Sequence, residues 1–177
     1  FAINGKLWAM HPEGTWHSAD GKTWAKSPLP NAINSQAFLD YVFFRNALYG
    51  LGYFSGNIEQ FTFRPEIYRT TNYKNWETVV KNSNLPRRFF YHPFVFKDKI
   101  WIIGGEDKNQ KYDDIWNSSD GVNWSRQKTG ASLGARSNSQ IVEMNGTLYL
   151  LNNDVWSSTD GMDWKLVTNE IVKGEQI

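Results

Sequence analysis

Apolar and polar residues alternate along this chain in short runs, which are separated by Gly, Asn, Asp and Pro. A period of two in runs rich in Val, Ile, Tyr, Trp and Thr predicts β-strands. The pattern is clearest near the C-terminus, where it predicts four successive strands, "NSQIVEM", "TLYLL", "DVWSS" and "DWKLV". No segment keeps the period of an amphipathic helix, so the sequence predicts an all-β protein.

A nine-residue motif with an aromatic residue at each end occurs four times. The copies are "WHSADGKTW" (Trp16 to Trp24), "YRTTNYKNW" (Tyr68 to Trp76), "WNSSDGVNW" (Trp116 to Trp124) and "WSSTDGMDW" (Trp156 to Trp164). Each copy predicts a hairpin that turns at Asp20, Asn72, Asp120 or Asp160, because Asp accepts turn amides and the following Gly takes a positive φ. In the second copy Tyr73 replaces the glycine, so we expect either a different turn or a protein that Tyr73→Gly stabilises.

A second motif, a short strand that follows a polar turn, alternates with the first: "NGKLWAM", "RNALYGL", "KDKIWII" and "NGTLYLL". Its aromatic residue follows the closing tryptophan of the preceding unit by 25 residues in each of the three cases. The distance from this aromatic residue to the next nine-residue motif is not fixed, and is 8, 19, 15 and 7 residues in the four units. Insertions that fall in one connection of a repeat lie on one face of the assembled structure, often the binding face.

Four repeated units of four strands, each with a tryptophan in the last strand, are typical of the blades of a β-propeller. We predict a single propeller domain over 1–177, with units at 1–30, 31–84, 85–131 and 132–177, either as a closed four-blade ring or as an arc of a larger propeller. The paired aromatic residues are predicted to join neighbouring blades, each burying about 200 Å². The alternative is that these tryptophans are exposed and stack on sugars.

Composition excludes several classes of function. The 177 residues are 40% hydrophobic and carry a net charge of +1, so neither nucleic acid nor an anionic membrane is an expected partner. No apolar stretch suits a membrane span, so no membrane insertion is expected. The absence of cysteine excludes disulfides and thiolate metal sites. The chain begins at Phe1 without a signal peptide, and we interpret it as a processed product, a fragment or part of a longer protein.

The order of strands resembles kelch propellers, and Gly104 and Gly105 match the kelch double glycine in one unit. The turns that begin at Ser18, Ser118 and Ser158 are similar to the Asp-box of sialidase-type propellers, but one residue shorter before the tryptophan. The chain also resembles uncharacterised kelch-like or galactose-oxidase-like propeller domains of bacteria. This resemblance implies a secreted, periplasmic or cell-surface protein. Galactose-oxidase chemistry is excluded, because its crosslinked cofactor requires a cysteine.

The two longest connections, "YFSGNIEQFTFRPE" and "GGEDKNQKYDD", are predicted to share a face with the segments that enter the innermost strands. This face gathers side chains suited to hydrogen bonding and stacking with a polar ligand, a glycan or a protein. The candidate ligand-binding residues are Arg64, Arg87, Arg88, Tyr91, His92, Glu106, Arg136 and Asn138. No catalytic residue, metal ligand or cofactor is predicted.

The alternative function is a sialidase-like glycoside hydrolase or another enzyme that uses the same face. A sialidase would require an arginine triad, for which Arg87, Arg88 and Arg136 occupy the equivalent place, although these arginines could equally be solvated rim charges. Paired carboxylates for glycoside hydrolysis could come from Glu106, Asp107, Asp113 and Asp114, which we expect to be solvated in their loop. His11, His17 and His92 lack the spacing of a metal site.

Overall fold

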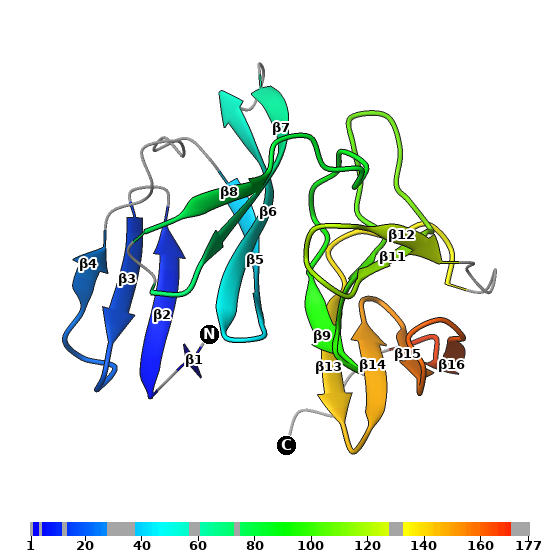
Figure 1. Cartoon of the computed structure of the whole chain (residues 1–177). Helices are drawn as coiled ribbons and strands as arrows, with labels where there is room; N and C mark the ends of the chain where they lie inside the picture. The colour runs from blue at the N-terminus through cyan, green and yellow to red at the C-terminus, as the bar shows by residue number, and fades with distance from the viewer. Residues whose placement is uncertain are drawn as a thin grey trace. The chain divides into compact units, whose positions relative to one another are not determined.

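The structure is a computed structural model that describes residues 2–3, 5–11, 14–27, 38–56, 61–72, 75–127 and 133–170. Its strands form four antiparallel sheets of four strands each (Figure 1). In every sheet the strands are neighbours in chain order, as hairpin connections require. The predicted all-β fold with four four-stranded blades is confirmed.

The first blade consists of β1 (Ala2–Ile3), β2 (Lys6–His11), β3 (Gly14–Ser18) and β4 (Ala25–Ser27). The second consists of β5 (Phe38–Phe44), β6 (Ala47–Gly56), β7 (Phe61–Thr70) and β8 (Glu77–Val80). The third consists of β9 (Phe94–Phe96), β10 (Lys99–Ile103), β11 (Ile115–Ser118) and β12 (Ser125–Gln127). The fourth consists of β13 (Gln140–Met144), β14 (Thr147–Leu151), β15 (Val155–Ser158) and β16 (Lys165–Thr168).

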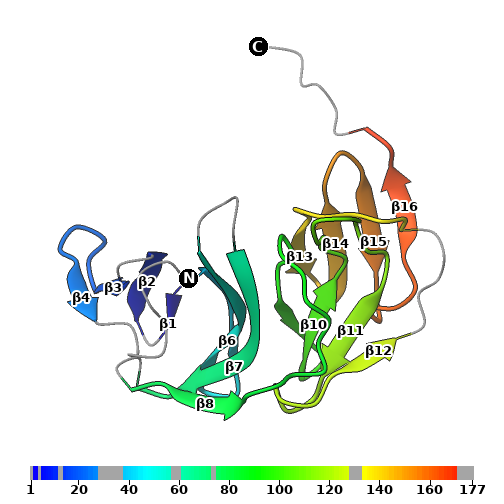
Figure 2. The same cartoon turned by 90° about the horizontal axis from the view of Figure 1, so that it is seen from above.

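The chain divides into two compact units, Phe1–Asn82 and Ser83–Ile177, each of which holds two blades. The strands of each sheet lie within one of the four ranges predicted from the repeat. In the second unit the sheet β9–β12 lies beside the sheet β13–β16 (Figures 1 and 2).

The outer hairpins turn at the Asp residues of the nine-residue motif. In the third blade, Ser118 Oγ donates to Asp120 Oδ1 at 2.9 Å, and the same carboxylate oxygen accepts the backbone N–H groups of Val122 and Asn123 at 2.8 Å. Gly121 has a φ of 76°, which glycine adopts without steric cost. The first and fourth blades repeat these bonds around Asp20 and Asp160.

The second blade makes equivalent hydrogen bonds with an amide in place of the carboxylate. Asn72 Oδ1 accepts the N–H of Asn75 at 2.8 Å, and Thr70 takes the place of the motif serine. Tyr73 lies outside the described residues, so the expected effect of Tyr73→Gly stays a prediction.

These turns predict a loss of stability in acid. The backbone N–H groups of Thr23 and Lys22 lower the pKa of Asp20 from 3.8 to about 2. Burial alone would raise the pKa of Asp120, but hydrogen bonds from Asn123 and Val122 lower it to about 2. Because the folded pKa values lie below the unfolded ones, the unfolded chain binds more protons as the pH falls. The stabilisation is therefore complete above about pH 4 to 5 and is lost as the pH falls toward 2.

Urea unfolding measured between pH 5 and pH 2 tests this expectation. Asp120→Asn should be less stable than the wild type at pH 5, and its stability should change less with pH. A wild type whose stability is constant from pH 5 to pH 2.5 would contradict the account of the turns.

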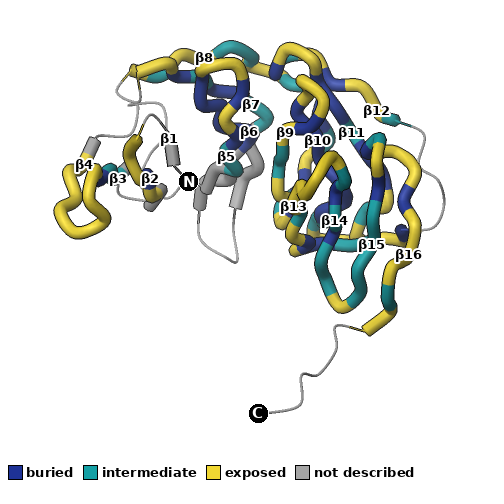
Figure 3. Tube along the Cα trace, turned by 90° about the horizontal axis from the view of Figure 1, so that it is seen from below, coloured by how far each residue is buried: buried dark blue, intermediate teal, exposed yellow. Residues whose placement is uncertain are grey.

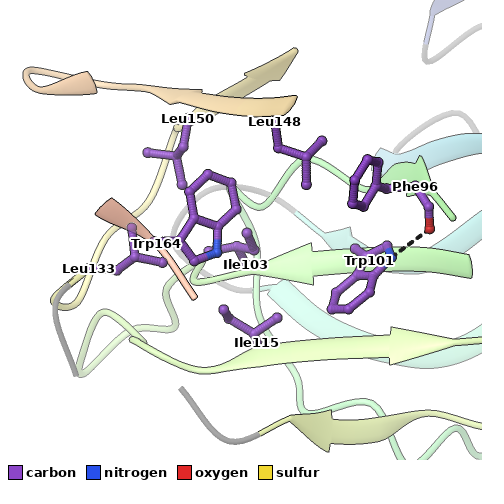
Figure 4. Close-up of a cluster of buried hydrophobic side chains, with 8 residues drawn as sticks. All are labelled: Phe96, Trp101, Ile103, Ile115, Leu133, Leu148, Leu150 and Trp164. Carbon is purple, nitrogen blue, oxygen red and sulfur yellow. Dashed lines mark hydrogen bonds between the residues drawn. The ribbon is translucent and has the colours of Figure 1, made fainter. Parts of the chain in front are cut away.

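The motif tryptophans join blades within each compact unit. In the second unit Trp164, of the fourth blade, is 4% exposed and lies in a cluster with side chains of β10, β11 and β14 (Figure 4). Trp101 of the third blade belongs to the same cluster and donates its Nε1–H to the carbonyl of Phe96 at 2.9 Å. In the first unit Trp76 packs in the same way against the cluster of Trp8 and Leu48.

Burial differs along the motif, as the tube coloured by exposure shows (Figure 3). The aromatic residues Tyr68, Trp124 and Trp164 are buried, and Trp16, Trp76, Trp116 and Trp156 are partly buried. Trp24 is 38% exposed, so the prediction that every motif aromatic is buried against a blade is wrong for this residue. The physical reason is that Trp76 packs against Trp8 and Tyr41, whereas Trp24 makes no such ring contact with the described residues.

Candidate functional site

Three segments of the second compact unit are hydrogen-bonded to one another: the connection 104–114 between β10 and β11, the segment 87–92 that leads to β9, and the segment 133–139 that leads to β13. Phe89 and Glu106 exchange both backbone hydrogen bonds at 2.9 Å. Gly105 N–H donates to the carbonyl of Arg136 at 2.9 Å. The connection between β10 and β11 is therefore fixed to both segments that enter innermost strands.

The glycines at the start of the connection permit this close approach. A Cβ atom on Gly104 would lie 2.3 Å from the carbonyl oxygen of Arg136, and φ at Gly104 is +62°. A Cβ on Gly105 would lie 3.1 Å from the side chain of Arg88. Gly104 has no room for a side chain, and at Gly105 a side chain would be tightly packed and its φ of +94° also favours glycine.

Arg88 and Asp114 form a buried ion pair inside this assembly. Arg88 is 1% exposed and Asp114 is 5% exposed. The guanidinium donates to both carboxylate oxygens, at 2.5 and 3.0 Å, and also to the carbonyl of Gly104 at 2.7 Å. The Tyr112 ring lies over the guanidinium, with its centroid 4.2 Å from Cζ.

The fourth blade repeats this arrangement nearer the surface. Arg136 Nη1 donates to Asp154 Oδ1 at 3.1 Å, and the two side chains are 11% and 26% exposed. In both blades the carboxylate also accepts the indole N–H of the tryptophan two residues later, Trp116 or Trp156. Burial would raise the pKa of Asp114 and Asp154, but these indole and guanidinium donors hold the pKa of each carboxyl below its usual value.

A polar pocket of about 330 Å³ opens beside Arg136 and Asp154. Its walls come from Lys111 in the connection of the third blade, 135–137 before β13, 152–154 between β14 and β15, and Asn169 after β16. Asn152 fixes two of these walls to each other, since its Nδ2 donates to the carbonyl of Ser137 at 2.9 Å and to Ser139 Oγ at 3.1 Å. Ser137 in turn donates to Glu106 Oε2 at 2.6 Å, which ties the pocket to the longer connection.

The predicted site residues have different places in this structure. Arg136 lines the pocket, and Glu106 supports it through Ser137. Arg88 and Tyr91 are 1% and 2% exposed, so we assign them to the framework of the site rather than to its ligand-contacting surface. The expectation of a solvated side chain is therefore wrong for Asp114, and the alternative of a solvated rim charge is wrong for Arg88, because the two charges neutralise each other in the interior.

The remaining predicted residues do not line the pocket. Arg87, His92 and Asn138 are exposed on the segments that enter β9 and β13. Arg64 lies in β7 of the other compact unit, where its backbone pairs with Tyr53, and its side chain lies outside the described ones.

Sequence reasoning missed the pocket residues Lys111, Asn152, Asn153, Asp154 and Asn169. One signal could have found the acid of the ion pair. Asp114 and Asp154 each precede the first tryptophan of a nine-residue motif by two residues. Arg88 and Arg136 each precede a strand aromatic, Trp101 or Tyr149, by 13 residues. A charge pair that recurs in the same register of a repeat predicts a contact.

Four repeated four-stranded antiparallel sheets, each with an Asp or Asn turn between its two outer strands, are typical of the blades of a β-propeller. The chain belongs to the family described as the DUF6242 beta propeller domain, whose family model matches residues 74–174, more than half of the chain. It is also similar to the solved structure of YjhT, with a TM-score of 0.67 and 11% sequence identity. The match covers 97% of this chain and 66% of the YjhT chain, so this chain spans less than two thirds of that protein. At this identity the similarity shows the fold alone.

No curated protein matches the chain. Among the described residues, no group of three or more His, Asp or Glu side chains is placed to hold a metal ion. Within the same part of the chain there is no helical segment whose length and hydropathy would suit a membrane crossing.

Proposed function

We propose that this propeller domain is a non-enzymatic binding module that holds a polar ligand, a carbohydrate, in the pocket of the fourth blade. The observation that carries the proposal is the pocket itself, which four separate segments build and which Asn152, Ser137 and Glu106 hold together by hydrogen bonds. Ligand sites are concave and carry a few well-placed polar groups on a rigid framework.

The charges in the pocket favour binding over hydrolysis. Glycoside hydrolysis needs two carboxyl groups on either side of the scissile bond. Among the residues that line the pocket, Asp154 supplies the only carboxylate. Both of its oxygens accept hydrogen bonds, from Arg136 and from the indole of Trp156, so this carboxylate serves the framework.

A glycan array probed with the wild type and with Asn153→Ala/Asn169→Ala tests the proposal. Both side chains line the pocket from exposed positions and make no hydrogen bond within the described structure, so their removal should leave the fold intact. We expect the double variant to lose at least about tenfold in affinity for any glycan that the wild type binds, since each lost polar contact costs about 1 kcal/mol or more.

Asn82→Ala is the matched control, because Asn82 is exposed and does not line the pocket. It should bind as the wild type does. The proposal fails if the wild type binds no glycan, or if the double variant, with an unchanged melting temperature, keeps full affinity.

A further inference from the structure

The hydrogen bonds around the pocket distinguish the groups that build it from those that remain for a ligand. Arg136 directs Nη1 and Nη2 to Asp154 and Nη2 also to the carbonyl of Leu133. Asn152 uses both donors of its amide on the wall, and its Oδ1 accepts the N–H of Asn153 at 2.8 Å. These side chains hold the framework and have little capacity left for a ligand.

Three side chains that line the pocket have their hydrogen-bonding groups available for a ligand. Lys111, Asn153 and Asn169 make no side-chain hydrogen bond or ion pair with the described part of the chain. The two amides can each donate to and accept from hydroxyl groups. The ammonium of Lys111 can only donate, and it carries a full charge.

Lys111 is the uncompensated charge among the lining residues. The charge of Arg136 is matched by Asp154 at 3.1 Å, which leaves the lining with one net positive charge. Glu106, whose backbone pairs with that of Lys111, does not line the pocket, and its Oε2 accepts the hydroxyl of Ser137. A ligand that placed a carboxylate near Lys111 would gain a charge-assisted hydrogen bond.

We infer that the pocket selects an acidic saccharide, whose carboxylate pairs with Lys111 and whose hydroxyls bond to Asn153 and Asn169. The inference rests on the proposed function and names the class of ligand. Selection of this kind requires the unpaired cation and the neutral amides to be within one small pocket, which the 330 Å³ volume provides.

The test compares a tetrasaccharide that contains glucuronic acid with its carboxyl-reduced counterpart, by isothermal titration calorimetry. We expect the acidic probe to bind the wild type at least about tenfold more tightly, and its affinity to fall with added salt. Lys111→Gln should reduce the affinity for the acidic probe to that of the neutral one and leave the neutral probe unaffected. Lys165→Gln, at an exposed position of β16 that does not line the pocket, should leave both affinities unchanged.

The outcomes separate the two proposals. Equal affinities for the two probes, both lost in Asn153→Ala/Asn169→Ala, would overturn the acidic preference and keep the binding function. A preference that Lys111→Gln does not alter would overturn the role of Lys111. If neither probe binds, the acidic-saccharide inference is overturned, and only other glycans on the array could then sustain the proposed function.

Discussion

Replacing Trp164 by alanine should destabilise the protein by about 3–5 kcal/mol, the cost of removing a large buried aromatic side chain. Trp164 is 4% exposed and belongs to the same buried cluster as Ile103 and Leu150 (Figure 4). Its indole N–H also donates to the carbonyl of Gly161, and Gly161 lies against the ring of Trp101. The variant would therefore leave a cavity where the third and fourth blades pack together. Urea unfolding at pH 7 measures the loss.

Trp24→Ala is the control, since Trp24 occupies the same motif position but is 38% exposed. We expect Trp24→Ala to lose less than half as much stability as Trp164→Ala, because the Trp24 side chain buries less apolar surface on folding. Equal losses in the two variants would show that burial does not decide the role of these tryptophans. A loss of glycan binding in Trp164→Ala without a change in stability would instead favour the sugar-stacking alternative.

The second large effect is expected from Arg88→Ala, which would leave the buried carboxylate of Asp114 with only the exposed Arg126, at 3.8 Å, as a cationic partner. Removing the close partner of a buried ion pair costs about 3–5 kcal/mol, because the remaining charge has lost its solvation and the hydrogen bonds that replaced it. Arg88 also donates to the carbonyl of Gly104, so the variant would loosen the start of the connection. The free energy of unfolding, measured with urea at pH 7, should fall by this amount.

Two further variants show whether the charge is the cause. Arg88→Met/Asp114→Leu replaces both charges by apolar side chains and should recover much of the loss. Arg69→Ala breaks an exposed pair with Glu77, in which the side chains are 39% and 57% exposed, and should cost less than about 1 kcal/mol. If Arg88→Ala costs no more than Arg69→Ala, the ion pair of Arg88 does not stabilise the blade.

The blades and their turns could be predicted from the sequence because they depend on local chemistry. Asp120 accepts hydrogen bonds from residues two and three positions later, and the alternation of side chains along "TLYLL" is a property of one strand. The spacing of the repeat also predicted the long connection of the third blade, whose two ends are joined by the hydrogen bond between Gly104 and Asp114. For the second blade the prediction of a long loop at 53–66 is wrong, because the inserted residues extend β6 to Gly56 and start β7 at Phe61.

The ion pairs and the pocket were harder to predict because their partners are far apart in the chain. Arg88 and Asp114 are separated by 26 residues, and Arg136 and Asp154 by 18. An arginine before an innermost strand has the same local sequence pattern whether its side chain is solvated or buried. Which of these occurs depends on the position of the connection between the second and third strands, which carries the partner aspartate. The amides of the pocket carry no signal at all, since Asn is an ordinary residue in turns.

The hydrogen bond that closes the connection has a consequence for protein engineering. The N–H of Gly104 donates to the carbonyl of Asp114 at 3.0 Å, and the N–H of Asn152 donates to that of Asp154 at the same distance. This hydrogen bond therefore joins residues that are ten positions apart in the third blade and two positions apart in the fourth. In both blades an arginine pairs with the aspartate at the end of the connection. Foreign peptides of different length are therefore expected to be tolerated at the exposed tip of the longer connection, 108–110, without a change in the blades.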